Sequence, residues 1–303
     1  MKVFLIGLGK MGGNMARRWL LAGHDVIGYD RDTTVAEKLA NEGRLIPVTS
    51  IADGVSKLSK PRVVWLMVPA GKVTEDTIFQ VSQSLSKDDV IVDGGNSNFN
   101  DSMRIARELT EKGIHFLDAG VSGGVWGLKE GYSIMVGGEE AAFKTIIPLI
   151  KSLAPSETTG WGLVGPSGAG HFTKMVHNGI EYGMMEAFAE GYDLMQSRKD
   201  FDLDLHQISE IWRHSSVIRS WLLDLISLAL ENDQELSHIQ PWISDSGEGR
   251  WTVNEAIKQD VPAPAIAAAL FRRFDSREEN SYAYRLISAM RNQFGGHTMK
   301  TEK

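Results

Sequence analysis

The chain has 303 residues, of which 42% are hydrophobic and 23% are charged, and its formal net charge is −7. This length and composition are typical of a globular protein with two domains, which can bury a core without covalent cross-links. The absence of cysteine excludes disulfides, thiolate nucleophiles and Cys-ligated metal sites. The negative charge argues against non-specific nucleic-acid binding, which needs a basic surface, but it allows a local basic site for a small anion.

No segment has the pattern of a membrane span or a targeting sequence. The apolar start Met1–Ile6 ends at Gly7, and no cleavage site of small residues follows it. The apolar run Trp221–Leu230 is too short to cross a bilayer and contains Asp224. We therefore expect a cytoplasmic protein that binds neither a membrane nor a nucleic acid.

The first half of the chain alternates short β-rich runs with helical patterns, which is typical of a parallel sheet covered on both faces. This predicts an α/β Rossmann-type dinucleotide-binding domain. The predicted strands are Val3–Gly7, Asp25–Tyr29, Val63–Val68, Val90–Asp93, His115–Asp118 and Tyr132–Val136, and helices are predicted at Gly12–Leu21 and Thr34–Glu42.

The second half has apolar positions at helical spacing from Ala169 to Asn292 and almost no strand-like runs. The turn residues Pro166-Ser167-Gly168 lie between the alternating strand–helix pattern and the purely helical pattern. We therefore predict a dinucleotide-binding domain over residues 1–166 and an all-α domain over residues 167–303.

A glycine-rich motif directly follows the first predicted strand: Gly7-Leu8-Gly9-Lys10-Met11-Gly12. In a G-x-G-x-x-G turn the first glycine permits the tight turn, the second lets the backbone approach a pyrophosphate, and the third lets the helix pack closely. The helix that follows directs its N–H groups at the phosphate. We assign all six residues to cofactor binding.

The choice of cofactor depends on Asp30, which ends the second predicted strand. A carboxylate at this position accepts hydrogen bonds from the adenosine ribose hydroxyls and repels a 2′-phosphate. The next residue, Arg31, is able to bind a 2′-phosphate if Asp30 turns away. We expect NAD as the preferred cofactor, with NADP as the weaker alternative.

Three further loops follow predicted strands: Val68-Pro69-Ala70-Gly71, Asp93-Gly94-Gly95-Asn96-Ser97 and Val121-Ser122-Gly123-Gly124. The carboxyl ends of parallel strands lie at one edge of a sheet, where ligands bind. Glycines and small polar side chains there suit the recognition of carboxylates and hydroxyls. We assign Val68, Pro69, Ala70 and Asn96 to the cofactor.

The main catalytic candidate is a predicted helix at the start of the second half. Lys174, Asn178 and Glu181 are spaced i, i+4 and i+7, so a helix places them on one face, and His177 and Tyr182 flank them. A solvated Lys–Glu face is the alternative. Three glycines, each of which lowers helix propensity by about 1 kcal/mol relative to alanine, favour a close approach of backbone to cofactor or substrate: Gly168, Gly170 and Gly179.

Four segments resemble the 6-phosphogluconate dehydrogenases. The run Lys174–Tyr182 resembles the active-site helix of that family, and Asp93–Ser97 and Val121–Gly124 resemble its substrate loops. The segment Arg291–His297 resembles its C-terminal tail motif. The resemblance covers essentially the whole chain, and the length matches the short form with a reduced helical domain.

The resemblance implies an enzyme that oxidises and decarboxylates 6-phosphogluconate to ribulose 5-phosphate and CO2. Lys174 would be the general base that takes the proton of the C3 hydroxyl, and Glu181 would protonate the enediol after CO2 has left. Both roles require shifted pKa values, which a dry cleft supplies. No metal is implied, and the sequence contains no ligand cluster at metal spacing.

The resemblance also implies a set of substrate contacts. The carboxylate and hydroxyls would be bound by Asn96, Ser122, Gly123, Gly124, His177 and Asn178. The phosphate would be bound by Tyr182, Arg273 and, from a neighbouring subunit, Arg291, with His297 nearby. Arg273 is matched through Phe271-Arg272-Arg273, so Arg272 is an alternative.

One segment departs from the family pattern. The longer enzymes have a Lys-Gly-Thr-Gly-Lys-Trp stretch that contacts the phosphate, whereas this chain has the shorter Asp245–Trp251, without the first Lys or the Thr. Glu248 beside a phosphate would be unfavourable. We expect that Arg250 does not replace the missing pair.

Two other functions remain open at this point. Another β-hydroxyacid dehydrogenase, of the hydroxyisobutyrate or tartronate semialdehyde type, would share the glycine motif and a lysine helix. A non-catalytic NAD-binding sensor is the other alternative, although the presence of both Lys174 and Glu181 argues against it. Because Arg291 lies so near the C-terminus, we expect a homodimer or homotetramer in which each tail completes a neighbour's site.

Overall fold

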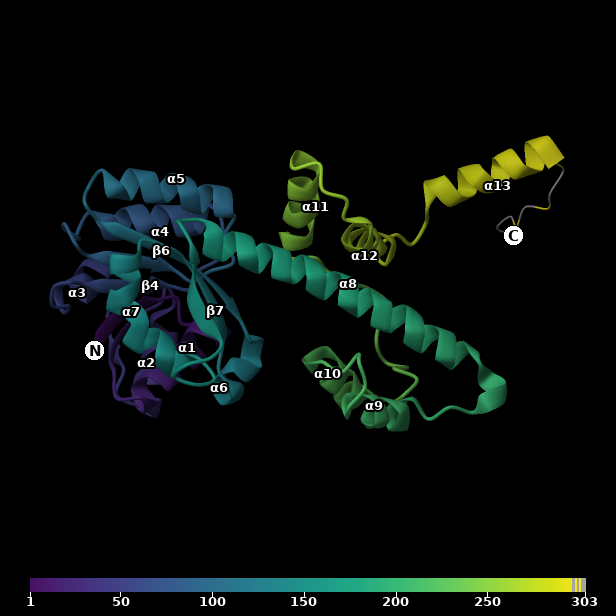
Figure 1. The fold of residues 1–303 in the computed structure, drawn as a ribbon, viewed down its shortest axis with the longest axis horizontal. Helices are drawn as coiled ribbons and strands as arrows, with labels where there is room; N and C mark the ends of the chain where they lie inside the picture. The colour runs from purple at the N-terminus through teal and green to yellow at the C-terminus, as the bar shows by residue number, and fades with distance from the viewer. Residues whose placement is uncertain (296–297, 299, 301–303) are drawn as a thin grey trace. The chain divides into compact units, whose positions relative to one another are not determined.

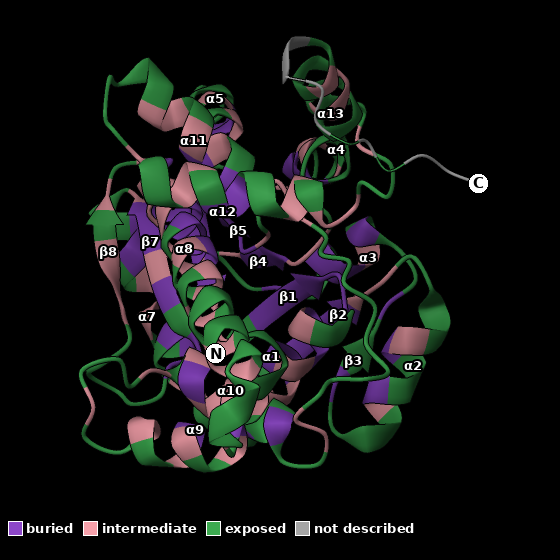
Figure 2. Cartoon of the chain, turned by 90° about the vertical axis from the view of Figure 1, so that its right-hand side faces the viewer, coloured by how far each residue is buried: buried purple, intermediate pink, exposed green. Residues whose placement is uncertain are grey.

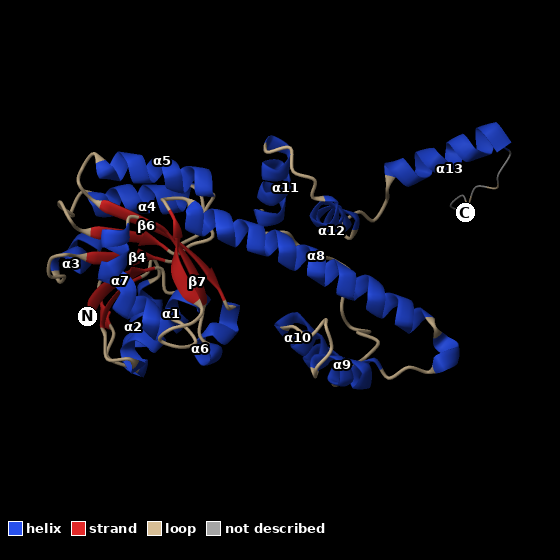
Figure 3. Ribbon diagram, in the orientation of Figure 1, coloured by secondary structure: helices blue, strands red, loops and turns tan. Residues whose placement is uncertain are grey.

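The computed structural model describes residues 1–295, 298 and 300. The chain divides into two compact units, an α/β unit that spans Met1–His177 and a helical unit that begins at Asn178. Figure 1 labels the elements along the chain, and Figure 3 shows that the strands of the described residues all belong to the α/β unit. This is the predicted fold class: a Rossmann-type domain followed by a helical domain.

The α/β unit contains one eight-stranded sheet in the order β3-β2-β1-β4-β5-β6-β7-β8. Its strands are β1 (Lys2–Ile6), β2 (Asp25–Tyr29), β3 (Ile46–Pro47), β4 (Val63–Leu66), β5 (Val90–Asp93), β6 (His115–Ser122), β7 (Ser133–Gly138) and β8 (Trp161–Gly165). The strand order reverses beside β1, which places the carboxyl ends of β1 and β4 at the crevice where such sheets bind ligands.

The sheet differs from the predicted parallel sheet in three ways. The β6 and β7 strands pair antiparallel, because residues 123–132 between them are too few for a parallel crossover, which takes about a dozen or more residues. Two strands were missed, and both are edges: β3, which contains Pro47, and β8, which is rich in glycine. In addition, β6 continues to Ser122, beyond its predicted end.

Helices cover both faces of the sheet. On β1, Val3 and Leu5 join one buried cluster, while Phe4 and Ile6 join the other, as the two-residue period of a strand requires. The first cluster includes residues of α1 (Lys10–Leu21), α2 (Thr33–Glu42) and α7 (Glu140–Leu153); the second includes residues of α3 (Ile51–Ser56), α4 (Lys72–Ser82) and α5 (Phe99–Thr110). Figure 2 shows the buried residues concentrated along the strands between these layers.

The longest helix, α8 (Ala169–Ser197), begins in the α/β unit and continues into the helical unit. Its start lies just after Pro166, where the domain boundary was predicted, whereas the compact units divide at His177. The first turns of α8 belong to the α/β unit because they pack against strand backbone. A Cβ on Gly170 would lie 2.3 Å from the carbonyl oxygen of Asp118 and 2.6 Å from that of Met135.

The helical unit contains the rest of α8, a 3-10 turn at Lys199–Phe201, and α9 (Leu205–Arg213), α10 (Trp221–Leu230), α11 (Glu248–Lys258), α12 (Pro264–Asp275) and α13 (Tyr282–Gly295). Packing of α9 on α10 and of α11 on α12 forms two helix pairs. A small buried cluster joins Tyr182 of α8 to Ala269 and Leu270 of α12. Within the described residues, no helix is both long enough and apolar enough to span a membrane.

Candidate active site

The glycine motif lies between β1 and α1, and its three glycines have three different surroundings. Gly7 has a φ of +91°, and a Cβ there would lie 2.4 Å from the carbonyl oxygen of Met67. A Cβ on Gly12 would lie 2.0 Å from the carbonyl oxygen of Gly7, whereas one on Gly9 would meet nothing within 4 Å. The first and third glycines are therefore required by the fold, and Gly9 leaves open space at the N-terminus of α1, where a phosphate fits.

Asp30 follows β2 and faces the glycine motif. Its carboxylate accepts hydrogen bonds from the backbone N–H of Leu8 at 2.7 Å and of Asp32 at 3.0 Å. These bonds hold the carboxylate beside the motif, while Arg31 is exposed. A fixed negative charge at this point suits ribose hydroxyls and disfavours a 2′-phosphate.

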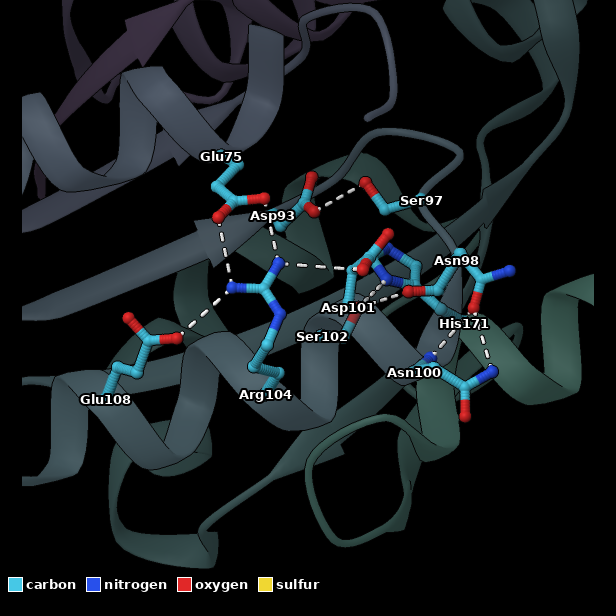
Figure 4. Close-up of polar contacts among 10 residues, drawn as sticks. All are labelled: Glu75, Asp93, Ser97, Asn98, Asn100, Asp101, Ser102, Arg104, Glu108 and His171. Atoms are coloured by element: carbon cyan, nitrogen blue, oxygen red, sulfur yellow. Dashed lines mark hydrogen bonds and ion pairs between the residues drawn. The ribbon is translucent and has the colours of Figure 1, made fainter. Parts of the chain in front are cut away.

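The loop after β5 is organised by Asp93, whose side chain is buried. One carboxylate oxygen accepts from the N–H of Gly95 at 3.0 Å. The other accepts from the hydroxyl of Ser97 at 2.7 Å, as Figure 4 shows. These two bonds fold the loop so that Asn96, at its tip, is exposed.

The predicted cofactor segment Val68-Pro69-Ala70 directly follows Met67 at the end of β4. The carbonyl oxygen of Pro69 accepts a hydrogen bond from the hydroxyl of Thr74 at 2.8 Å, which ties the segment to the first turn of α4. The neighbouring strands β1 and β2 carry the glycine motif and Asp30 at the same edge of the sheet. The cofactor residues predicted from sequence are thus brought together at one edge.

Ser122 ends β6, and a short helical segment follows it: a 3-10 turn at Gly124–Trp126 and α6 (Gly127–Glu130). Gly123 and Gly124 have φ values of +140° and +52°, which residues other than glycine rarely adopt. The ring of Tyr132 packs beneath this segment, since a Cβ on Gly127 would overlap its Cε1 at 1.9 Å. Burial raises the pKa of the Tyr132 hydroxyl, so the tyrosine that packs against this segment stays neutral.

Lys174 lies on the first turns of α8 and is 7% exposed. Its Nζ is 3.5 Å from Nδ1 of His177, so these two candidate residues are neighbours. Lys174 packs directly on β6, because a Cβ on Gly120 of that strand would lie 2.5 Å from the Cβ of Lys174. Gly170, which was predicted to approach a ligand, instead lies against the backbone of β6 and β7.

Asn178 and Glu181 follow on α8, one and two turns after Lys174, and α8 is continuous through all three positions. The predicted helix and its spacing are therefore confirmed. Asn178 is buried and Glu181 is half-buried, so this stripe is not a solvated Lys–Glu face. Gly179 allows close packing with α11, because a Cβ there would lie 2.7 Å from Cγ2 of Thr252.

In the helical unit, Arg273 lies against Tyr182, its guanidinium 3.5 Å from the centre of the ring. Arg273 also donates to the carbonyl oxygen of Ser244 at 2.8 Å. Arg272, the alternative considered from sequence, instead donates to Glu186 at 3.2 Å, and this bond raises the pKa of its guanidinium. The structure thus brings Tyr182 and Arg273 together and directs Arg272 elsewhere.

Arg250 forms a bidentate contact with Asp245, with N–O distances of 2.9 and 3.1 Å. Hydrogen bonds from Arg250 and then Arg277 hold the pKa of the Asp245 carboxyl below its ordinary value. The guanidinium of Arg250 is therefore already bound by Asp245, which supports the expectation that Arg250 does not replace the missing phosphate contacts. Glu248 is buried and accepts a hydrogen bond from the hydroxyl of Ser246, which also lies 3.4 Å from the hydroxyl of Tyr182.

Two predicted residues belong to the C-terminal tail. Arg291 lies on α13 and is exposed. His297 lies outside the described residues. In the described part of the chain, no three His, Asp or Glu side chains are grouped as metal ligands.

Sequence reasoning missed Asp118 and Ser246. Asp118 is fully buried on β6 and accepts hydrogen bonds from two N–H groups at the start of α8. The signal was an alternation of Asp118, Gly120 and Ser122 along one face of a strand, which was hidden because the predicted strand ended at Asp118. For Ser246 the sequence contains no comparable signal.

Two family models match the chain: the NAD binding domain of 6-phosphogluconate dehydrogenase over residues 2–162, and the C-terminal domain of 6-phosphogluconate dehydrogenase over residues 170–283. A relative from Haloferax volcanii, an NAD(+)-dependent, decarboxylating 6-phosphogluconate dehydrogenase, is 40% identical over 98% of both chains. The chain belongs to the 6-phosphogluconate dehydrogenase family.

Solved structures agree with this membership. The 6-phosphogluconate dehydrogenase of Plasmodium falciparum matches all of this chain and 66% of its own, with a TM-score of 0.85 and 27% identity. The 3-hydroxyisobutyrate dehydrogenase of Mycobacterium tuberculosis matches 88% of this chain and 90% of its own, with a TM-score of 0.71 and 22% identity, and shows a shared fold only. The chain thus matches nearly all of the Haloferax volcanii relative and about two thirds of the longer Plasmodium falciparum enzyme.

Proposed function

We propose that the protein oxidises and decarboxylates 6-phosphogluconate to ribulose 5-phosphate and CO2, with NAD as the preferred oxidant. The observation that carries the proposal is the buried Lys174, 3.5 Å from His177 and followed at helical spacing by Asn178 and Glu181. The full-length similarity to the NAD(+)-dependent Haloferax enzyme supports the same activity.

The residues of the α/β unit fit a bound NAD. The open space at Gly9 admits a pyrophosphate to the N-terminus of α1, which has no side-chain cap of its own. Asp30 is held beside the motif to accept from the ribose hydroxyls. When bound, NAD supplies the acceptor for the hydride that leaves the substrate.

The chemistry we propose for this chain begins with Lys174. Its neutral amine accepts the proton of the C3 hydroxyl as the hydride leaves C3, and a 3-keto acid results. The ammonium of Lys174 then donates a hydrogen bond to the ketone oxygen and stabilises the electrons left there when CO2 departs.

Glu181 completes the proposed reaction two turns further along α8. After CO2 has left, its carboxylic acid protonates the enediol carbon, which gives ribulose 5-phosphate. Asn96, Ser122, Gly123, Gly124, His177 and Asn178 are proposed to bind the carboxylate and hydroxyls, and Tyr182 with Arg273 to bind the phosphate. An arginine fork suits phosphate because it binds two oxygens at once.

The test is a coupled assay of purified protein with 6-phosphogluconate and either NAD or NADP. Absorbance of the reduced cofactor and released CO2 are followed together. Equal yields of both, faster with NAD, are expected. Reduction without CO2 would contradict the proposal and indicate a simple hydroxyacid dehydrogenase, while a protein that binds NAD without turnover would be a sensor.

We further propose a cytoplasmic homodimer or homotetramer in which α13 of one copy packs on another and brings Arg291 to its phosphate site. The support is the surface of α13, on which Tyr282, Tyr284, Leu286, Ile287 and Met290 are between 44% and 69% exposed. So many large apolar side chains on one helix indicate a contact surface. The cytoplasmic location remains a prediction from the sequence.

A further inference from the structure

The start of α8 is held by a buried carboxylate on the neighbouring strand. Asp118 of β6 is fully buried, and its two oxygens accept from the N–H of Gly168 at 2.6 Å and of His171 at 2.8 Å. The first N–H groups of a helix have no partner within the helix, and a negative charge beside them is favourable. Asp118 therefore ties the first turn of α8 to the sheet, three residues before Lys174.

The same face of β6 determines where Lys174 lies. Residues 118, 120 and 122 point to one side of a strand because the period is two. Gly120 has no side chain. A Cβ on Gly120 would lie only 2.5 Å from the Cβ of Lys174, so the lysine can pack here only because residue 120 is glycine. Three residues on one face of β6 thus follow one another. Asp118 binds the start of α8, Gly120 leaves room for Lys174, and Ser122 belongs to the proposed substrate site.

The opposing strand leaves room for this anchor. Gly137 of β7 is the register partner of Asp118. A Cβ on Gly137 would lie 2.6 Å from Oδ1 of Asp118 and 2.7 Å from the backbone nitrogen of Gly170. Any larger residue would force the carboxylate or the helix to move.

A second hydrogen bond holds the same turn from the other side. Nδ1 of His171, whose side chain is buried, lies 2.7 Å from the hydroxyl of Ser102 on α5 (Figure 4). The backbone of His171 is bonded to Asp118 and its side chain to Ser102, so this residue is held at two points. Lys174 follows one turn later.

We infer that Asp118 is a positioning residue for Lys174: it sets the depth and direction at which α8 leaves the sheet, and so the place of the lysine amine relative to Ser122. This inference rests on the proposed role of Lys174 as the base. The contacts of Asp118 predict that its loss lowers turnover and leaves NAD binding unchanged, because the glycine motif and Asp30 do not depend on it.

The experiment compares Asp118→Asn with a matched control, Asp89→Asn. Asp89 is also fully buried and accepts from two backbone N–H groups, of Arg62 at 2.8 Å and Ser86 at 2.9 Å. It accepts in addition from the Arg62 guanidinium at 3.3 Å and the Ser86 hydroxyl at 3.2 Å, so its loss should cost at least as much stability. It immediately precedes β5, at the amino edge of the sheet and away from the proposed site. For each protein, kcat and KM with 6-phosphogluconate, Kd for NADH and Tm are measured.

We expect Tm to fall in Asp89→Asn by at least as much as in Asp118→Asn. In contrast, kcat falls by about 10- to 100-fold in Asp118→Asn only, because small misplacements of a reacting group are costly. Kd for NADH stays within about threefold of wild type in both. Equal losses of kcat in the two variants, or an unchanged kcat in Asp118→Asn, would overturn the inference. A wild-type protein without turnover would instead overturn the proposed function, and the inference with it.

If Asp118→Asn does not fold, Gly120→Ala carries the same test without removing a hydrogen bond. Its new Cβ meets the Cβ of Lys174 and, at 2.7 Å, the carbonyl oxygen of Gly170, so α8 must shift. The control is Gly162→Ala on β8, where a Cβ meets nothing within 4 Å. Loss of kcat in Gly120→Ala alone supports the premise that turnover depends on how deep α8 lies on β6, which is what Asp118 is inferred to set. Equal kcat in both variants refutes the inference.

Discussion

Asp30 holds a negative charge beside the glycine motif because two backbone N–H groups bind its carboxylate. We expect Asp30→Asn to shift cofactor preference, since an amide no longer repels a 2′-phosphate and the exposed Arg31 is able to bind one. The ratio of kcat/KM for NADP over that for NAD should rise by about tenfold or more, as is typical when a like charge is removed from a site. Steady-state kinetics with both cofactors measure it.

The control for this prediction is Asp32→Asn, two residues further along. The Asp32 carboxylate caps α2 by accepting from the N–H and hydroxyl of Thr34, bonds that lower its pKa. Because the amide oxygen of asparagine caps a helix about as well as a carboxylate, Asp32→Asn should leave both the helix and the cofactor ratio nearly unchanged. An Asp30→Asn enzyme that retains the wild-type ratio would show that Asp30 does not select the cofactor.

The adjacent arginines 272 and 273 form a natural pair for testing the phosphate site. Arg273 lies on the ring of Tyr182, whereas Arg272 is bonded to Glu186. We expect Arg273→Ala to raise KM for 6-phosphogluconate by about 10- to 100-fold, the value of a lost charged hydrogen bond, and Arg272→Ala to change it little. A larger effect from Arg272→Ala would reverse the assignment.

At the scale of elements, a substitution at the N-terminus of α1 can test cofactor binding without changing the stability of the fold. Because a Cβ on Gly9 meets no protein atom within 4 Å, Gly9→Ala should fold normally and place a methyl group where the pyrophosphate approaches. We expect an unchanged Tm and a Kd for NADH weaker by about tenfold, equivalent to about 1.4 kcal/mol. Fluorescence titration of NADH measures the affinity.

Gly183→Ala provides the comparison, since it also adds a methyl group in open space on a helix but lies in the helical unit. It should leave NADH affinity unchanged. A Gly9→Ala protein that binds NADH normally would mean that the cofactor does not approach α1 as we propose.

The segment before α11 is stabilised by charge, and this makes its stability depend on pH. In the folded state Arg250 and Arg277 lower the pKa of Asp245, whose side chain is 5% exposed. A carboxyl with a lowered folded pKa contributes stability above its unfolded pKa of about 3.9, and the contribution is lost as pH falls through the folded value. Wild type should therefore have a higher Tm than Asp245→Asn at pH 7, and the difference should begin to shrink below about pH 4 and close as pH falls through the folded pKa.

Thermal unfolding of both proteins from pH 7 to pH 3 measures this difference. The control Asp260→Asn changes an exposed aspartate outside the contacts of Arg250 and Arg277, so its Tm should stay close to that of wild type. A Tm gap for Asp245→Asn that does not narrow at all between pH 5 and pH 3 would contradict the ion-pair explanation.

For the whole molecule, the apolar surface of α13 predicts that assembly and activity depend on the tail. A chain truncated after Ser281 should sediment as a smaller species than wild type and lose most of its turnover, because Arg291 would be missing from a neighbour's phosphate site. Arg291→Ala is the partner variant, which should retain the wild-type assembly and raise KM for the substrate. A wild-type monomer with full activity would refute the shared site.

The elements that were predicted correctly owe their signals to local chemistry. The glycine motif, Asp30 and the lysine helix require particular residue types at short spacing, and each is found where the pattern placed it. The edge strands β3 and β8 were missed because edge strands need little hydrophobic alternation, and the glycines and proline there indicate turns.

The sequence alone determined the fold class, the family and the identity of the candidate residues, because these depend on periodicity and on motifs read along the chain. Only the tertiary structure decided which side chains meet across long separations. It directed Arg273 rather than Arg272 to Tyr182, engaged Arg250 with Asp245, and placed Asp118 at the start of α8, fifty residues away. Such contacts depend on how strands and helices pack, and packing leaves no local pattern in the chain.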